Sequence, residues 1–332
     1  MTKLTVTDMH TGGEPVRIVT GGYPPIPSGT ILEKRAWVRE NLDHLRKLLM
    51  FEPRGHYDMY GALLVEPDLP QADLAVLFMH NEGYSTMCGH AVVALGRYAV
   101  DSGLVPAREP VTTVNIEAPC GLVAAAVEVR NGKAGAVSFE SVPAFLFSAG
   151  RSVDLPGYGT IGFDVAYGGA FYALADCRRF GLAFGRDRVR DFVDAATALT
   201  EKLKAEFPLA HPDHADLAFL YGTILTDGGD GRGAPTKNVC VFADAEVDRS
   251  PTGSGVTARL AAMHAKGEIG IGETRTFESI AGSRFTGSVA RVTRAGAHDA
   301  VTARVGGRAF YSGKAVFTLE EDDELGRGFL LR

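Results

Sequence analysis

The strongest candidate for chemistry is a thiol at the start of a predicted helix. Cys88 stands in the segment Ser-Thr-Met-Cys-Gly-His, directly before an alanine-rich helix predicted over His90–Val100. The amino terminus of a helix stabilises negative charge, so it favours the thiolate form of a cysteine placed there. The backbone amides of Gly89 and His90 can also bind a carboxylate. One element could therefore supply both a base and an anion site, whereas the alternative is a buried structural cysteine.

A second segment has the same layout. Residues Asp248–Gly255 read D-R-S-P-T-G-S-G, follow a strand-like run and open a second alanine-rich helix predicted over Ser254–Lys266. When Cys88 is aligned with Thr252, four of sixteen positions are identical, which indicates a weak internal repeat. Two such helix starts would face each other across a cleft between two similar domains, and the glycines would let a ligand approach the backbone.

Three other patterns do not indicate a site. The glycines of 157–162 spell G-x-G-x-x-G, but no helix start follows to hold a pyrophosphate. The pair His211 and His214 encloses a proline and has no third ligand nearby in sequence, so no metal is expected. The loop around Asp227 and Asp230 lacks the alternating oxygens and closing glutamate of a calcium loop.

The two helix-start segments, M-C-G-H and D-R-S-P-T-G-S-G, resemble the two signatures of the proline racemase superfamily. The resemblance spans the chain and includes the segments 8–15, 53–61 and 237–242. In the racemases and 4-hydroxyproline epimerases of that family each signature supplies a cysteine, one for each face of the substrate α-carbon. Here Thr252 takes the second position, and Ala91 stands where the racemase motif continues with glycine. The departure at Thr252 matches the branch of trans-3-hydroxy-L-proline dehydratases, and Ala91 is a further difference from the racemases.

Physical reasoning favours the same branch. Racemisation needs a base on one face and an acid on the other, and a threonine hydroxyl is far too weakly acidic to serve as the second group. A substrate with a leaving group on the β-carbon needs only one base. Removal of the α-proton of trans-3-hydroxy-L-proline would expel the 3-hydroxyl, and the enamine would tautomerise to Δ1-pyrroline-2-carboxylate without any cofactor. The alternatives are a proline racemase or 4-hydroxyproline 2-epimerase that uses water held by Thr252, and a non-catalytic protein that binds proline analogues such as pyrrole-2-carboxylate.

The resemblance also implies a role for each candidate site residue. Cys88 would take the α-proton, and Thr252 would donate a hydrogen bond to the departing hydroxyl or hold a water there. The carboxylate would be bound by the amides of Gly89, His90, Gly253 and Ser254, and the ring ammonium by Asp248. His90 could instead act as an acid, although a helix amino terminus disfavours a cationic imidazole. A Cys–His hydrolase is disfavoured because the side chains of Cys88 and His90 are expected to diverge.

Composition limits the remaining possibilities. The chain has 332 residues and a formal net charge of −6, so it offers no basic field for nucleic acid. No run of apolar residues is long enough to cross a membrane, which predicts a soluble, cytoplasmic protein. Cys120, Cys177 and Cys240 lie in or beside strand patterns and are expected to be buried structural thiols. A homodimer is compatible with the sequence but is not indicated by it.

The elements that must position the site are predicted as an α+β fold. Strand-like runs dominate both halves, and helices are predicted over Glu33–Met50, His90–Val100, Asp187–Glu206 and Ser254–Lys266. The resemblance implies two domains of diaminopimelate-epimerase-like fold, each a curved sheet around a central buried helix, with the active site in the cleft between them. We expect the first domain over residues 1–150, joined by the last few C-terminal residues, and the second over 151–325. The junction is expected within Phe147–Tyr158, where polar residues, glycine and proline interrupt the strand pattern.

Overall fold

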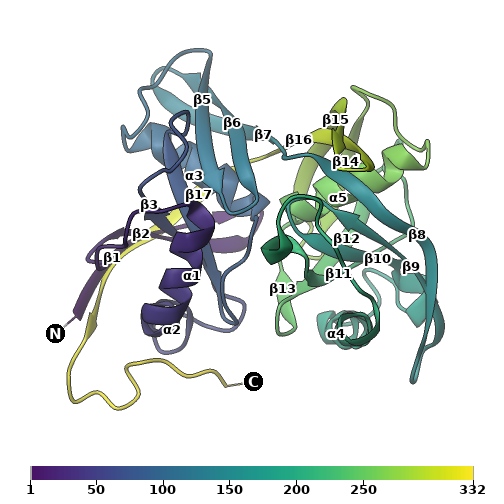
Figure 1. The fold of residues 1–332 in the computed structure, drawn as a ribbon, viewed down its shortest axis with the longest axis horizontal. Helices are drawn as coiled ribbons and strands as arrows, with labels where there is room; N and C mark the ends of the chain where they lie inside the picture. Colours follow the sequence, from purple (N-terminus) through teal and green to yellow (C-terminus); the bar gives the residue numbers. More distant parts are fainter. Residues whose placement is uncertain (1, 332) are drawn as a thin grey trace. The chain divides into compact units, whose positions relative to one another are not determined.

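The computed structural model describes residues 2–331, and its elements confirm the α+β class (Figure 1). The helices are α1 (Ile31–Asn41), α2 (Asp43–Met50), α3 (Gly89–Asp101), α4 (Val189–Glu206) and α5 (Gly253–Ala265), with short 3-10 helices η1 (Cys177–Phe180) and η2 (Ala215–Leu217). The strands are β1 (Thr2–Thr11), β2 (Glu14–Gly21), β3 (Tyr60–Val65), β4 (Leu74–His80), β5 (Val111–Ala118), β6 (Gly121–Arg130), β7 (Lys133–Glu140), β8 (Ala144–Leu155), β9 (Gly159–Tyr167), β10 (Phe171–Asp176), β11 (Leu220–Thr226), β12 (Thr236–Phe242), β13 (Glu246–Asp248), β14 (Thr274–Ser279), β15 (Arg284–Ala295), β16 (His298–Gly307) and β17 (Ala309–Leu319).

Three of the four predicted helices are confirmed to within two residues at each end, and the fourth is broken. The segment predicted as one helix over Glu33–Met50 forms α1 and α2, which are separated at Leu42. Leu42 leaves the helical region with φ −125° and ψ 14°. It lies between Asn41 and Asp43, residue types that compete with helical hydrogen bonds and favour helix ends, so the apolar stripe alone overestimated the length of this helix.

The first compact unit comprises the residues up to Ser138 together with those from Arg308 onward. Its strands pair in the order β17–β1–β2–β3–β4–β5–β6. Helix α3 packs against β1, β2, β5, β6 and β17 and is the central helix of this unit, while α1 and α2 pack against β3 and β4 (Figure 1). Ten of the thirteen residues of α3 are buried, which confirms the predicted buried helix.

The second unit comprises Phe139–Gly307 and encloses its helix more completely. Its strands close into a ring in the order β8–β9–β10–β11–β12–β14–β15–β16 and back to β8. Helix α5 packs against β8, β9, β10, β15 and β16, whereas α4 packs against β11, β12 and β8. Gly168, in the turn after β9, lies so close to α5 that a Cβ there would be 2.2 Å from the Ser254 carbonyl oxygen. Only glycine permits this approach.

The chain passes from the first unit to the second after Ser138 and returns to the first unit after Gly307. Both positions lie earlier in the sequence than the predicted domain boundaries. Residues 147–158, expected to be a linker, instead form most of β8 and the turn into β9. The polar residues there lie on an exposed stretch of an antiparallel strand, and Gly150 adopts a positive φ of 60° within it. A bulged, solvent-exposed strand has the composition of a loop, so the pattern was misinterpreted. The glycines of 157–162 lie in this hairpin and open no helix.

Candidate active site

The candidate thiol lies where the sequence predicts it, at the start of α3. Cys88 is the N-cap residue, with extended φ and ψ of −144° and 105°, and its carbonyl oxygen accepts the first helical hydrogen bond from the Val92 amide at 3.0 Å. The first turn of α3 contains no acidic residue. The helix therefore directs the positive end of its dipole at the thiol without competition from a carboxylate in that turn. The Cys88 side chain is buried, with 4% of its surface exposed.

The imidazole of His90 faces this thiol. Cys88 Sγ lies 3.1 Å from His90 Nδ1 and 3.7 Å from Nε2. The expectation that these two side chains diverge is therefore wrong. It assumed regular helical spacing, but Cys88 is extended and lies outside the helix, so its side chain can turn back over the first turn.

A contact from the first hairpin fixes the protonation of the imidazole. His90 Nε2 lies 3.2 Å from the Pro15 carbonyl oxygen, which can only accept a hydrogen bond. Nε2 therefore carries the proton, and in the neutral ring Nδ1 presents its lone pair to the Cys88 thiol. The imidazole is placed to accept the thiol proton, and the negative charge of the resulting thiolate 3.1 Å away would offset the unfavourable effect of the helix dipole on the imidazolium.

The same hairpin also holds the backbone of His90. The Thr11 hydroxyl donates to the His90 carbonyl oxygen at 2.8 Å, and the turn between β1 and β2 contains Gly12 and Gly13 at positive φ. The Tyr60 ring packs edge-on against the His90 ring with centroids 4.9 Å apart, and its hydroxyl hydrogen-bonds Ser85. The sequence singled out segment 8–15 only by resemblance. The structure indicates that this hairpin orients His90.

Thr252 starts the central helix of the second unit in a conformation rare for its residue type. Its φ is +63° and ψ 92°, and it is the N-cap of α5. A β-branched residue at positive φ is strained, and such strain is concentrated at functional sites. Its side chain is 5% exposed, and its hydroxyl has no hydrogen-bond partner among residues 2–331. A buried hydroxyl without a partner is costly in a folded protein, which is consistent with a partner supplied by a ligand.

The residues around Thr252 form a local hydrogen-bonded chain. Asp248 Oδ1 accepts from the Ser250 amide at 2.7 Å, and the Ser250 hydroxyl accepts from the Thr252 amide at 3.1 Å. The Ser254 hydroxyl lies 2.7 Å from the Tyr172 hydroxyl, and Gly255 is so close to Ile224 that a Cβ would be 2.5 Å from its Cδ1. The predicted residues Asp248, Thr252, Gly253 and Ser254 are thus brought together at one helix start.

Two of the other cysteines have raised pKa values. Burial raises the pKa of Cys120 to about 12 and that of Cys177 to about 11. Cys177 and Cys240 are buried as predicted, whereas Cys120 is only half-buried. Cys177 and Cys120 are therefore protonated at neutral pH and weak nucleophiles.

Within the part of the chain that the structure describes, no three His, Cys, Asp or Glu side chains are grouped to hold a metal ion, and no helix is long and apolar enough to cross a membrane. The His211 ring packs against Tyr167, with centroids 4.8 Å apart. The arrangement instead offers one thiol next to a base and one buried hydroxyl, each at the start of a helix whose amides can bind an anion.

The comparisons with known proteins identify the class. The proline racemase family model matches residues 6–330, so the chain belongs to the proline racemase family. Trans-L-3-hydroxyproline dehydratase of Xenopus tropicalis is 58% identical, covering 99% of this chain and 95% of the relative. Trans-3-hydroxy-L-proline dehydratase of Burkholderia ambifaria is 45% identical, covering 99% and 98%.

A solved structure extends the similarity to the fold. The hydroxyproline epimerase of Agrobacterium vitis, solved with trans-4-hydroxy-L-proline bound, superposes with a TM-score of 0.93 at 30% identity, covering 99% of this chain and 96% of that one. The epimerase-like fold expected from the sequence is therefore confirmed.

Proposed function

We propose that this protein is a trans-3-hydroxy-L-proline dehydratase, a hydro-lyase that forms Δ1-pyrroline-2-carboxylate. The observation that carries the proposal is the chemical difference between the two helix starts. One has the Cys88 thiol 3.1 Å from an imidazole nitrogen, and the other has the Thr252 hydroxyl. A single competent base is sufficient for elimination but not for two-sided proton transfer. Relatives 45–58% identical over almost the whole chain carry the same activity in their names.

In the proposed reaction, His90 Nδ1 accepts the thiol proton of Cys88, and the thiolate then takes the α-proton of the substrate. The electron pair of the Cα–H bond forms the Cα–Cβ double bond, and the C3–O bond breaks. The hydroxide that leaves and the proton later released from Cys88 together make the water of dehydration. The enamine product tautomerises to the cyclic imine, so the reaction is redox-neutral and needs no cofactor.

The remaining site residues would bind the substrate in this proposal. Thr252 donates its hydroxyl proton to a hydrogen bond with the departing oxygen, which supplies the buried hydroxyl with a partner. The amides of Gly89, His90, Gly253 and Ser254 hold the carboxylate and stabilise charge as it develops on it. Asp248 receives the ring ammonium.

The decisive experiment is an imine assay with o-aminobenzaldehyde across the stereoisomers of 3- and 4-hydroxyproline. We expect imine only from trans-3-hydroxy-L-proline. Incubation with L-proline in deuterium oxide provides the comparison, because a racemase or epimerase with water at Thr252 would produce deuterated D-proline. Binding of pyrrole-2-carboxylate without turnover of any hydroxyproline would contradict the proposal and favour a non-catalytic binding protein.

A further inference from the structure

The second unit contains a cavity at the far end of α5 from Thr252. Its volume is about 600 Å³, within the range of sites for small organic ligands. The α5 residues that line it are Arg259, Ala262 and Met263, with Lys266 just beyond, so it faces the later turns of the helix. Strands β8, β9 and β10, the end of β11, the η1 helix, the β11–β12 loop and Glu268 supply the rest of its lining. The apolar residues of the whole lining include Phe163, Leu174, Ala175, Ala262 and Met263.

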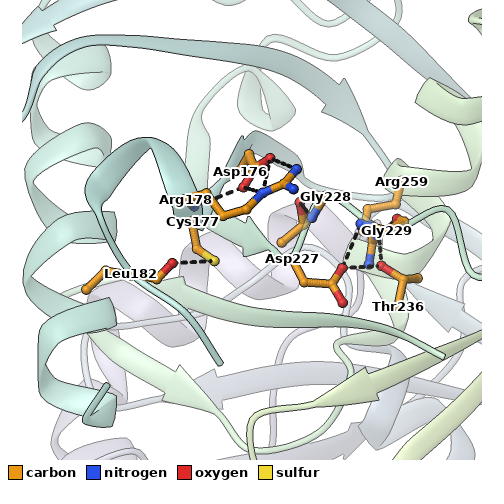
Figure 2. Close-up of polar contacts among 10 residues, drawn as sticks. Asp176, Cys177, Arg178, Leu182, Asp227, Gly228, Gly229, Thr236 and Arg259 are labelled. Carbon is orange, nitrogen blue, oxygen red and sulfur yellow. Dashed lines mark hydrogen bonds and ion pairs between the residues drawn. The ribbon is translucent and has the colours of Figure 1, made fainter. Parts of the chain in front are cut away.

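A buried guanidinium lines this cavity without a carboxylate partner. Arg259 is 6% exposed and forms no ion pair among the described residues. It donates from Nη1 to Asn238 Oδ1 at 2.9 Å and from Nη2 to the Gly229 carbonyl oxygen at 3.4 Å. Nη2 also donates to the Thr236 hydroxyl at 2.8 Å (Figure 2), and all three acceptors are neutral. Burial lowers the pKa of Arg259 to about 10, and Asp227 and Glu268 oppose this shift at longer range, so the group stays cationic at neutral pH. Buried charges are normally paired, whereas Arg259 is linked to the Asp227 carboxylate only through the Thr236 hydroxyl, which donates to Asp227 Oδ1 at 2.8 Å. The guanidinium therefore remains available to a directly bound anion.

Two further guanidinium groups line the same cavity. Arg151 comes from β8 and Arg179 from η1, and neither forms an ion pair within residues 2–331. Arg151 lies over the Phe207 ring, 5.9 Å from its centroid, and the Arg179 guanidinium lies beside Gly162. Both are exposed, so they can reach a ligand that enters from solvent.

The acidic groups that line the cavity are mostly engaged by other cations. Asp164 is paired with Lys266. Asp176 is held by Arg178 (Figure 2), whose hydrogen bonds lower the Asp176 pKa, with a smaller contribution from Arg179. Asp230 pairs with Arg232 at 3.6 Å. Glu268 is exposed to solvent. The lining itself holds four cationic side chains and four carboxylates. Because Asp176 and Asp230 are paired with Arg178 and Arg232, which lie outside the lining, the carboxylates do not fully compensate the positive charge of Arg151, Arg179 and Arg259.

We propose that this cavity binds a small anionic compound, with carboxylate or phosphate oxygens accepting hydrogen bonds from Arg259, Arg179 and Arg151. A guanidinium presents paired N–H groups that match these oxyanions, and three of them from three elements suit a compound with two anionic groups better than a single small ion. The apolar lining would contact the carbon skeleton between those groups.

The cavity is also connected to the candidate active site by a short chain of hydrogen bonds. Asn238, whose Oδ1 accepts from Arg259, donates through Nδ2 to the Pro251 carbonyl oxygen at 3.0 Å, directly before Thr252. An anion that accepts hydrogen bonds from the Arg259 guanidinium would change the hydrogen bond between Arg259 and Asn238. The hydrogen bond from Asn238 to Pro251 would change with it, and hence the strained conformation of Thr252. Occupancy of the cavity should therefore change the rate of dehydration, a consequence that rests on the proposed function.

Binding is tested on the full chain with inorganic phosphate and succinate by isothermal titration calorimetry at constant ionic strength. Saturating pyrrole-2-carboxylate is present throughout to occupy the catalytic site. We expect saturable binding of succinate, weakened at least tenfold by Arg179→Gln or Arg151→Gln, both exposed positions where the fold should be retained. Arg190→Gln is the matched control, because it removes the same charge from the exposed surface of α4, and it should leave the affinity unchanged.

The opposing results are equally specific. Absence of saturable binding for both probes, or equal weakening by Arg190→Gln, would overturn the anion site. If succinate bound only when pyrrole-2-carboxylate was omitted, the catalytic site would be the true location. Imine formation with and without saturating succinate then tests the connection: we expect at least a twofold change that is lost in Arg179→Gln. Binding without any change in rate would refute the coupling to Thr252.

Discussion

Replacing Thr252 by glycine should stabilise the protein while impairing its activity. The native residue has two unfavourable features, a positive φ on a β-branched side chain and a buried hydroxyl without a partner among the described residues. Backbone strain of this kind costs about 1–3 kcal/mol. An unsatisfied buried hydroxyl costs about 1–3 kcal/mol as well. Glycine removes both.

The gain is reduced by two smaller losses. Burial of the threonine methyl group contributes about 0.8 kcal/mol. The greater freedom of glycine in the unfolded chain costs about 0.5–1 kcal/mol. A net stabilisation of about 2 kcal/mol is left, and it should raise the Tm by roughly 4–8 °C for a unit of this size.

Thermal unfolding of ligand-free protein measures this effect, with Thr252→Val and Thr252→Ser as matched variants. Valine keeps the branched shape and the strain but removes the hydroxyl, so its Tm should lie between those of the native and glycine proteins. Glycine and valine should each lower the rate of imine formation at least tenfold, whereas serine should keep most of it because it keeps the hydroxyl. A Tm of the glycine and valine variants at or below that of native protein would refute both the strain and the unpartnered hydroxyl.

Four further outcomes follow from the site. Cys88→Ser should reduce dehydration at least about a hundredfold, because a hydroxyl is too weak a base, and retention of a tenth of the rate would refute the thiolate assignment. Iodoacetamide at pH 8 should alkylate Cys88 ahead of Cys120 and Cys177. The raised pKa values of Cys120, about 12, and Cys177, about 11, keep those two thiols protonated until far higher pH. Peptide mass spectrometry with and without pyrrole-2-carboxylate checks this order of alkylation. Thr252→Cys should gain detectable racemisation of L-proline by polarimetry, and the double variant with Cys88→Ser should not. Exhaustive EDTA treatment and removal of nucleotides should leave the rate of dehydration unchanged. A requirement for a metal ion or a nucleotide would overturn the mechanism.

The features predicted successfully from the sequence are those encoded locally. The starts of α3 and α5 could be predicted from three local features: small residues, a change of hydrophobic period and a glycine beyond each helix end. For each helix these features lie within about twenty positions of the chain. The placement of Cys88 and Thr252 directly before these helices is confirmed, whereas their catalytic roles stay predictions. The break at Leu42 was missed because the apolar stripe continues through it, although Asn41 and Asp43 flank the break.

The geometry around His90 could not be derived from spacing. Its tautomer depends on Pro15, and its backbone on Thr11, contacts that join segments more than seventy residues apart in sequence. The approach of Cys88 to His90 depends on the extended conformation of a single N-cap residue, which helical periodicity does not describe. Arg259 was likewise inconspicuous, because an arginine in an alanine-rich helix does not reveal from sequence whether its charge is paired.

The two helix starts show how one fold could support different reactions. Each provides free amide groups and the positive end of a helix dipole, so each can bind and stabilise an anion regardless of its N-cap side chain. At α3 the cap is an extended cysteine within reach of a fixed imidazole, whereas at α5 it is a threonine at positive φ with no such neighbour described. The amides are backbone groups and survive any substitution of the cap. Replacement of the threonine oxygen by a cysteine sulfur at the second cap would then allow proton transfer on the second face of the α-carbon while leaving carboxylate binding intact. The Thr252→Cys variant tests that separation of binding from chemistry.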